Sequence, residues 1–243
     1  MTERPPLARR DFFRLGLVAG PAALVSACGW DGGPLLQPKL RAFSRINDWV
    51  GEKVLLSSSR LAPEYPVAAR TPVTDFPAYS ITYNDTGSFP FSKTDWKLEV
   101  GGLVSRPLRL SQAQIQALPR LTYTVKHHCV EGWTAIATWT GVRLTTVAEL
   151  VHPTAAARYI RFDSFDEGYS NGWDLASAMH PQTILAYAYN DRPLMMNHGA
   201  PLRLYSPIKL GYKLTKYLTK VTFTAERPGG YWEDQGYPWF GGL

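Results

Sequence analysis

The sequence predicts an α+β fold with mixed sheets, short helices and a single domain. Three observations carry this prediction: several short stretches with strand-like alternation, short helical segments between them, and many turn residues, with 20 Gly and 19 Pro in 243 residues. No Gly-x-Gly-x-x-Gly motif opens a helix after a strand, and no phosphate-binding loop is present. A doubly wound nucleotide-binding fold is therefore not expected.

The elements can be assigned in chain order. From Leu61 to Pro90 the chain is rich in Pro, Tyr and Ser with little periodicity, which predicts an irregular arm wrapped on the domain. Trp96–Val100 alternates and ends at two glycines, so it is expected to be a strand. Ser111–Leu118 is expected to be a short helix, capped by its serine and stopped by the following proline. Thr122–Cys129 alternates again and predicts a strand.

The second half continues the same pattern. Thr145–Val151 predicts a helix, and Leu175–Met179 predicts a helical turn. Further strands are expected at Tyr159–Phe162, Ile184–Tyr189, Pro201–Tyr205 and Leu218–Ala225.

The N-terminus predicts an export signal at residues 1–27. Arg9-Arg10 forms a twin-arginine pattern, and the apolar run from Leu15 to Ala27 is shorter than the roughly 20 residues that a membrane-spanning helix needs. Small residues precede Cys28, which fits either lipid attachment to that cysteine or ordinary signal cleavage. Residues 28–60 are expected to form a tether and N-terminal arm, and residues 61–243 the domain. The predicted location is the periplasm, with lipid on Cys28 as an option.

Composition limits the kinds of partner. The net charge is +6, and the Lys and Arg residues are dispersed rather than clustered. This gives little support to nucleic-acid binding and is compatible with an anionic ligand or an anionic membrane surface.

Cys129 is the only cysteine between Cys28 and the C-terminus. Lys126, His127 and His128 precede it, and such an electropositive setting is expected to lower the pKa of a thiol. On a strand, His127 and Cys129 would share one face. The thiol is thus a candidate metal ligand or nucleophile, with a buried inert cysteine as the alternative.

Other chemistries for this thiol have less support. Zinc is disfavoured because neighbouring strand residues point apart and no second ligand pair completes a tetrahedral set. A cysteine protease would need His180 or His198 as base, yet the sequence around Cys129 matches no such signature. The nucleophile elbow Gly-x-Ser-x-Gly of serine hydrolases is absent.

Four motifs, in order, resemble the sulfite oxidase family of molybdenum enzymes, and most closely its bacterial periplasmic branch, which contains the methionine sulfoxide reductase catalytic subunit. They are Cys129-Val130-Glu131-Gly132-Trp133, the run from His198 to Leu204, the run from Lys209 to Lys216, and Gly230-Tyr231-Trp232-Glu233. The resemblance implies the molybdopterin-binding fold of that family, molybdenum-molybdopterin as cofactor, Cys129 as metal ligand, and two-electron oxo transfer as the reaction.

The resemblance also implies site residues. The positions that match pterin contacts in the family are Asn84, Ser164, His198, Arg203, Leu214, Thr215 and Lys216. Arg203 and Lys216 are the natural phosphate partners among them. Tyr187 matches a tyrosine on the substrate side of the metal, which implies a catalytic role. The alternatives are a solvated face for Lys216, a satisfied turn histidine for His198 and a core tyrosine for Tyr187.

Departures from the family pattern bear on the substrate. Sulfite oxidases carry arginines after the ligand cysteine and before the asparagine, whereas this chain has Glu131, Trp133 and Tyr83 at or near those places. Such a pocket would bind an anion poorly, so reduction of a neutral sulfoxide, such as methionine sulfoxide, is expected ahead of sulfite oxidation. A non-catalytic cofactor- or solute-binding lipoprotein is the alternative from another class. The chain has no haem-attachment motif and no added dimerisation domain, which predicts a monomer served by a separate redox partner such as a membrane cytochrome b.

Overall fold

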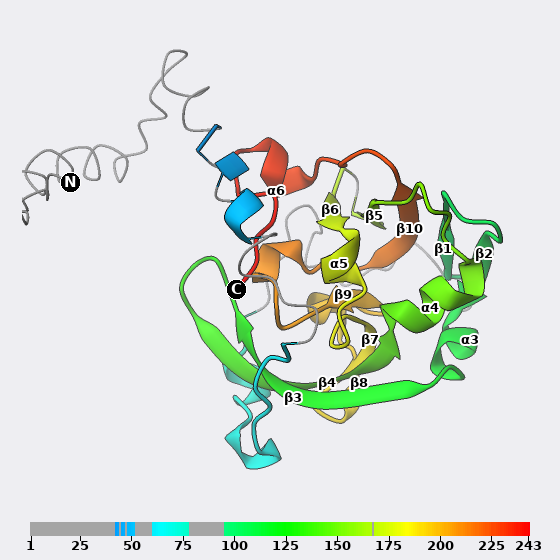
Figure 1. Cartoon of the computed structure of the whole chain (residues 1–243). Helices are drawn as coiled ribbons and strands as arrows, with labels where there is room; N and C mark the ends of the chain where they lie inside the picture. Colours follow the sequence, from blue (N-terminus) through cyan, green and yellow to red (C-terminus); the bar gives the residue numbers. More distant parts are fainter. Residues whose placement is uncertain (1–41, 44, 47, 52–59, 78–94, 167) are drawn as a thin grey trace, which may run out of the picture. The chain divides into compact units, whose positions relative to one another are not determined.

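Two five-stranded sheets form the frame of the described part of the chain (Figure 1). The computed structural model describes residues 42, 43, 45, 46, 48–51, 60–77, 95–166 and 168–243. The chain separates into two compact units at Ile46, and the fold and the site belong to the second, Asn47–Leu243. Within the described residues no helix is both long enough and apolar enough to cross a membrane.

The first sheet is mixed, as the sequence predicts. Its order is β2 (Leu108–Ser111), β1 (Lys97–Gly102), β10 (Leu218–Thr224), β5 (Tyr159–Ser164) and β6 (Ser170–Asp174). β1 and β10 pair in parallel, and the other neighbours pair antiparallel. The end of β5 and the turn after it lead toward the site described below.

The second sheet is antiparallel throughout its described pairs. Its order is β3 (Arg120–His128), β4 (Thr134–Arg143), β7 (Ile184–Tyr189) and β8 (Arg192–Pro193), and β9 (Arg203–Tyr205) also pairs with β7. β3 and β4 form a long hairpin whose last pair is His128 with Thr134. The five residues Cys129–Trp133 are therefore the hairpin loop, and the Cys129 thiol lies just beyond the end of the sheet.

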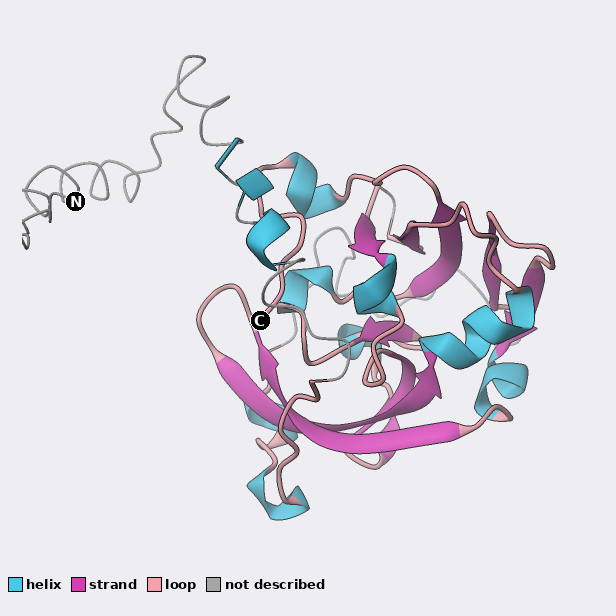
Figure 2. Ribbon diagram, in the orientation of Figure 1, coloured by secondary structure: helices cyan, strands magenta, loops and turns pink. Residues whose placement is uncertain are grey.

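Short helices connect the strands (Figure 2). The α-helices with described bounds are α3 (Gln112–Gln116), α4 (Leu144–Val151), α5 (Leu175–Ala178) and α6 (Tyr231–Asp234). The described 3-10 turns are η2 (Val67–Ala69), η3 (Val73–Asp75), η4 (Met196–His198) and η5 (Gly211–Lys213). The predicted cap of the first helix is confirmed, because Ser111 accepts a hydrogen bond from the Gln114 amide and forms a capping box.

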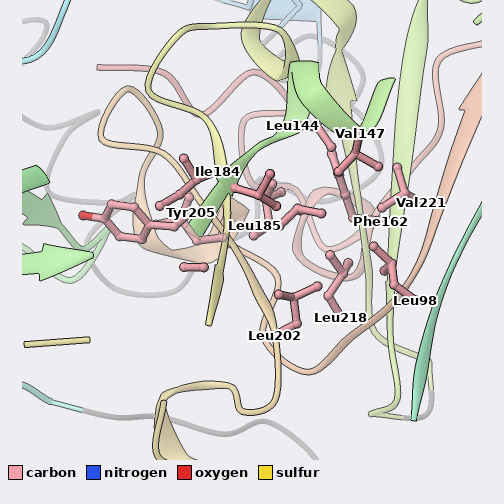
Figure 3. Close-up of a cluster of buried hydrophobic side chains, with 14 of the residues drawn as sticks. Leu98, Leu144, Val147, Phe162, Ile184, Leu185, Leu202, Tyr205, Leu218 and Val221 are labelled. Atoms are coloured by element: carbon pink, nitrogen blue, oxygen red, sulfur yellow. The ribbon is translucent and has the colours of Figure 1, made fainter. Parts of the chain in front are cut away.

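The core takes side chains from both sheets and from α4 (Figure 3). Leu144, Val147, Ala148 and Val151 are buried at the spacing of one helix face, so α4 contributes a stripe to this core. The described part of the predicted arm, residues 61–77, follows the hairpin: the Tyr65 amide donates to the Thr124 carbonyl of β3 and the Thr71 amide to the Ile136 carbonyl of β4. The rest of the predicted arm, residues 78–90, lies outside the described residues.

Candidate active site

A cavity of roughly 180 Å³ lies beside the hairpin loop. Its walls come from the hairpin, the arm, the turn after β5, the segment 198–217 and the C-terminal segment. The lining residues are Phe76, Pro77, His127, Cys129, Val130, Glu131, Trp133, Asp166, Tyr169, His198, Arg203, Gly211, Tyr212, Leu214, Lys216, Tyr217, Trp232 and Tyr237. Segments distant in sequence thus converge on one thiol.

Cys129 is half-buried and is placed by the hairpin loop. Its amide donates to the Trp133 carbonyl at 3.0 Å, and its own carbonyl accepts from the Gly132 amide at 3.1 Å. Gly132 has a φ of 91°, a conformation that glycine adopts without steric cost, so the loop can turn this tightly. The predicted strand Thr122–Cys129 ends one residue early, at His128, so Cys129 does not lie on a strand face; His127 and Cys129 nevertheless both line the cavity.

The prediction of a lowered thiol pKa is wrong. Burial raises the pKa of Cys129, and the nearby Glu131 carboxylate adds to this, while backbone amides oppose it only in part. The Cys129 Sγ lies 3.8 Å from Glu131 Oε2, which also accepts from Trp133 Nε1 at 3.0 Å. The loop therefore presents the Glu131 carboxylate beside the thiol, as the departure from the family pattern suggested, and its charge counteracts the cations that precede Cys129 in the sequence.

Arg203 is a buried cation in the cavity wall, with 3% of its surface exposed. Its Nη1 donates to the His198 carbonyl at 2.9 Å and its Nη2 to the Leu214 carbonyl at 3.3 Å. In the described part of the chain no carboxylate pairs with it, and its Nε has no hydrogen-bond partner. Burial lowers the pKa of Arg203 to about 10, so it remains charged at neutral pH. An unpaired buried charge of this kind calls for an anionic ligand.

Lys216 adds a second cation to the same cavity. Its Nζ donates to the Asn197 carbonyl at 2.8 Å, and burial together with the neighbouring Arg203 lowers the pKa of Lys216 to about 7. Gly199, with a φ of 102°, lies against it: a Cβ there would sit 3.0 Å from the Lys216 side chain. The solvated-face alternative for Lys216 is therefore not what the structure shows.

Two buried histidines line the cavity in their neutral form. Burial, aided by the charge of Arg203, lowers the pKa of both His127 and His198 to about 3. The Phe76 ring contacts both, with centroids 5.2 Å from His127 and 5.3 Å from His198. His127 Nδ1 has no hydrogen-bond partner among the described residues. Neutral imidazoles can accept or donate one hydrogen bond to a bound group without adding charge.

The other residues implied as cofactor contacts divide into three groups. Leu214 lines the cavity, whereas Thr215 lies behind it, fully buried, with its Oγ1 3.4 Å from the donating Asn171 Nδ2. Ser164 does not line the cavity; its Oγ accepts from the Asp166 amide at 3.0 Å and so shapes the turn that brings Asp166 there. Asn84 lies outside the described residues.

Tyr187 does not line the cavity. The register of β4 and β7 shifts here, with Thr140 opposite Ala188 but Gly141 opposite Ala186, so Tyr187 is the extra residue of a bulge. A bulge redirects the side chain, and Tyr187 packs instead at the edge of the hydrophobic core. Its catalytic role stays a prediction without support from its position.

Some cavity residues were not singled out from the sequence. Tyr169 and Tyr237 line the cavity, and so do Tyr212 and Trp232, which were noted only as parts of family motifs. The clustering of aromatic residues near the C-terminus was visible in the sequence, but their convergence depends on the tertiary fold.

Comparison with known proteins decides the class. Residues 86–232 match the family of oxidoreductase molybdopterin-binding domains. The chain belongs to this family. It is a molybdenum-dependent oxidoreductase with molybdopterin as cofactor, and the resemblance to the sulfite oxidase family is confirmed.

The residues present fit this cofactor. The unpaired guanidinium of Arg203, with its free Nε, suits an anionic group, and the close approach of Gly199 to Lys216 leaves no room for another side chain there. Among the described residues no cluster of three or more His, Cys, Asp or Glu side chains is arranged to hold a metal. Cys129 offers one soft ligand to a metal that arrives with its own cofactor.

Similar proteins point in the same direction. A protein of Azospira oryzae, YedZ1, provisionally named as a protein-methionine-sulfoxide reductase subunit, is 39% identical over 97% of this chain and 88% of its own length. The MsrP catalytic subunit of the protein-methionine-sulfoxide reductase of Campylobacter jejuni is 30% identical over 93% of this chain and 76% of its own length. The crystal structure of sulfane dehydrogenase SoxCD from Paracoccus pantotrophus matches 58% of this chain and 41% of that chain, with a TM-score of 0.54 and 20% identity. The last likeness concerns the fold alone.

Proposed function

We propose that the protein reduces sulfoxide groups, with methionine sulfoxide as the substrate class. The overall reaction takes up two electrons and two protons, breaks the sulfur–oxygen bond, and releases a thioether and water. The observation that carries the substrate choice is the Glu131 carboxylate, 3.8 Å from the ligand thiol, together with the aromatic lining of the cavity. The names of the two relatives described above support it.

The chain's own groups divide the cavity into two functions. Arg203, Lys216 and His198 would hold the cofactor, with Arg203 fixed in place by the carbonyls of His198 and Leu214. When bound, molybdopterin supplies a metal that exchanges an oxygen atom in a two-electron step. Cys129, in its hairpin loop, would be the protein ligand of that metal.

The substrate side is lined by Glu131, Trp133, Trp232 and Tyr237. A carboxylate in this place repels an anion such as sulfite and leaves a neutral sulfoxide unaffected. Aromatic rings make favourable contacts with sulfur and with methyl groups. These properties favour a sulfoxide over sulfite, although sulfite remains the competing substrate to test.

We further propose that the protein works in the periplasm as a monomer and receives electrons from a membrane partner of cytochrome b type. Support comes from the twin-arginine pattern and from Cys28, both of which lie outside the described residues, and from the word "subunit" in the names of both relatives. Lipid on Cys28 would hold the enzyme next to such a partner.

Kinetics with a reduced dye as electron donor test this proposal. We expect turnover with methionine sulfoxide and little oxidation of sulfite when the dye is supplied in oxidised form. Glu131→Gln is expected to strengthen inhibition by sulfite several-fold, because one repulsive charge is gone, while the exposed control Glu149→Gln changes nothing. A protein without molybdenum from a host that makes the cofactor would instead support the binding-lipoprotein alternative. A loaded enzyme that oxidises sulfite faster than it reduces any sulfoxide would overturn the substrate assignment.

A further inference from the structure

One wall of the cavity is a short C-terminal segment that cannot hold its own shape. Residues 231–237, called the C-terminal wall below, comprise α6 and the turn after it, and they bring Trp232 and Tyr237 to the cavity. The two rings lie 5.0 Å apart between centroids. Within α6 only the Glu233 side chain is enclosed, and a helix of four residues is far shorter than one that is stable alone. Contacts from elsewhere must therefore fix this wall.

One of these contacts is a buried ion pair between Lys213 and Glu233. The side chains are 0% and 4% exposed, respectively, and the Lys213 Nζ also donates to the Gly172 carbonyl at 2.8 Å. Lys213 thereby joins the C-terminal wall to β6. Just after the wall, the Tyr212 hydroxyl donates to the Pro238 carbonyl at 2.6 Å. Two neighbouring residues of η5, Tyr212 and Lys213, therefore fix the wall at two places.

The space around Glu233 is shaped for its carboxylate. A Cβ at Gly230 would lie 2.3 Å from Glu233 Oε2, although the backbone there is extended and would accept any residue. Glycine at this position is thus explained by the carboxylate and not by backbone strain. The Lys213–Glu233 pair does not line the cavity, so its effect on the reaction must pass through the residues that it holds.

We propose that Lys213 and Glu233 are positioning residues that hold the C-terminal wall against the cavity and so set its affinity for the sulfoxide substrate. This inference rests on the proposed function. Because the wall supplies Trp232 and Tyr237, displacing it removes binding contacts while leaving Cys129 and Arg203 in place. Lost contacts of this kind raise KM and leave kcat nearly unchanged.

The test uses the molybdenum-loaded protein, four test variants and one control variant. Glu233→Gln and Lys213→Met each break the pair, and their double variant removes both charges, which avoids an unpaired buried charge and protects the fold. Gly230→Ala displaces the carboxylate without removing it. Gly101→Ala is the matched control, since a Cβ there meets nothing within 4 Å.

Three readouts are needed. Titration calorimetry with methionine sulfone, which has no sulfoxide to reduce, measures substrate-site affinity without turnover. Hydrogen exchange follows the amides of Gly236 and Tyr237, which bond within the wall, and of Asp234, which bonds to the adjoining Gly230 carbonyl. Steady-state kinetics with methionine sulfoxide and molybdenum content complete the set.

The expected result is a roughly tenfold rise in both the Kd of the sulfone and the KM of the sulfoxide, with kcat changed by less than about twofold and molybdenum content unchanged. Exchange of the wall amides should accelerate by about tenfold or more, and the control should match wild type. Unchanged exchange in the double variant and in Gly230→Ala, or activity lost only in proportion to molybdenum, would overturn the inference. If loaded wild type neither binds the sulfone nor reduces any sulfoxide, the proposed function fails, and hydrogen exchange alone then decides whether the pair holds the wall.

Discussion

Arg203→Met is expected to weaken cofactor retention while leaving the apoprotein about as stable as wild type. The lowered pKa, from 12.5 to about 10, corresponds to roughly 3 kcal/mol against the buried charge. Methionine removes that cost but leaves the His198 and Leu214 carbonyls without their donor, a loss of about 3 kcal/mol in total for one good and one long bond. Its thioether can keep contact with the Trp139 ring, which lies 4.9 Å from the guanidinium. The removed cost of burying the charge and the lost hydrogen bonds offset each other to within about 1 kcal/mol.

Cofactor binding has no such compensation. A charge-assisted hydrogen bond to an anionic group contributes about 1.5–3 kcal/mol, so its loss should reduce molybdenum occupancy about tenfold or more under limiting cofactor. The assay compares molybdenum per chain in protein from a cofactor-producing host with urea unfolding of apoprotein from a host that makes none. Arg109→Met, at a 72% exposed side chain paired with Glu99, is the control and should change neither quantity. Full molybdenum occupancy in Arg203→Met, or an apoprotein destabilised by more than about 3 kcal/mol, would refute this reasoning.

Three further predictions concern the apoprotein. Burial lowers the pKa of His198 to about 3, so it contributes stability above pH 6.5 that is lost as pH falls toward 3. In His198→Gln the free energy of urea unfolding should therefore depend less steeply on pH between 6.5 and 3, by at most about 1.4 kcal/mol per pH unit. Equal pH dependence in variant and wild type would contradict this. Asp174 caps α5 and faces Lys209, whose pKa burial lowers to about 7. Asp174→Ala should therefore cost about 1 kcal/mol at pH 9 through the lost cap, and the cost should grow as pH falls below 7, where Lys209 must carry an unpaired charge; a cost independent of pH would argue against the pairing. Gly141→Ala should destabilise the fold by about 1–3 kcal/mol or more, because its Cβ would lie 2.2 Å from a β7 carbonyl, whereas Gly101→Ala should behave like wild type in thermal unfolding.

The sequence predicted the elements whose local pattern agrees with their environment. The strand at β1, the capped helix α3 and the apolar stripe of α4 all follow from short-range spacing, and all are observed. β6, with the sequence Ser-Asn-Gly-Trp-Asp, was missed because it is buried on both sides and because Asn171 and Asp174 contact residues distant in the sequence, Tyr212 and Lys209. β4 was missed although it is the longest described strand, because it is buried on both faces over much of its length and its Thr and Ala residues give no clear alternation of apolar and polar positions.

The sequence predicted the site residues that belong to a family motif and have suitable chemistry. It did not predict the features of the site that depend on tertiary contacts. Cys129, His198, Arg203, Leu214 and Lys216 converge on the cavity as the resemblance implied. The raised thiol pKa, the bulge that redirects one tyrosine and the C-terminal wall depend on burial and strand register. Single-sequence spacing carries little information on either.

X-ray absorption at the molybdenum edge, on wild type and Cys129→Ser, tests the central claim most directly. Serine keeps the loop geometry and replaces the soft sulfur ligand by oxygen. The account predicts that molybdenum is retained in the variant, that its sulfur coordination falls by one ligand, and that methionine sulfoxide reduction is lost. Unchanged sulfur coordination in the variant would show that Cys129 is not the ligand and would contradict the assignment of this cavity as the active site.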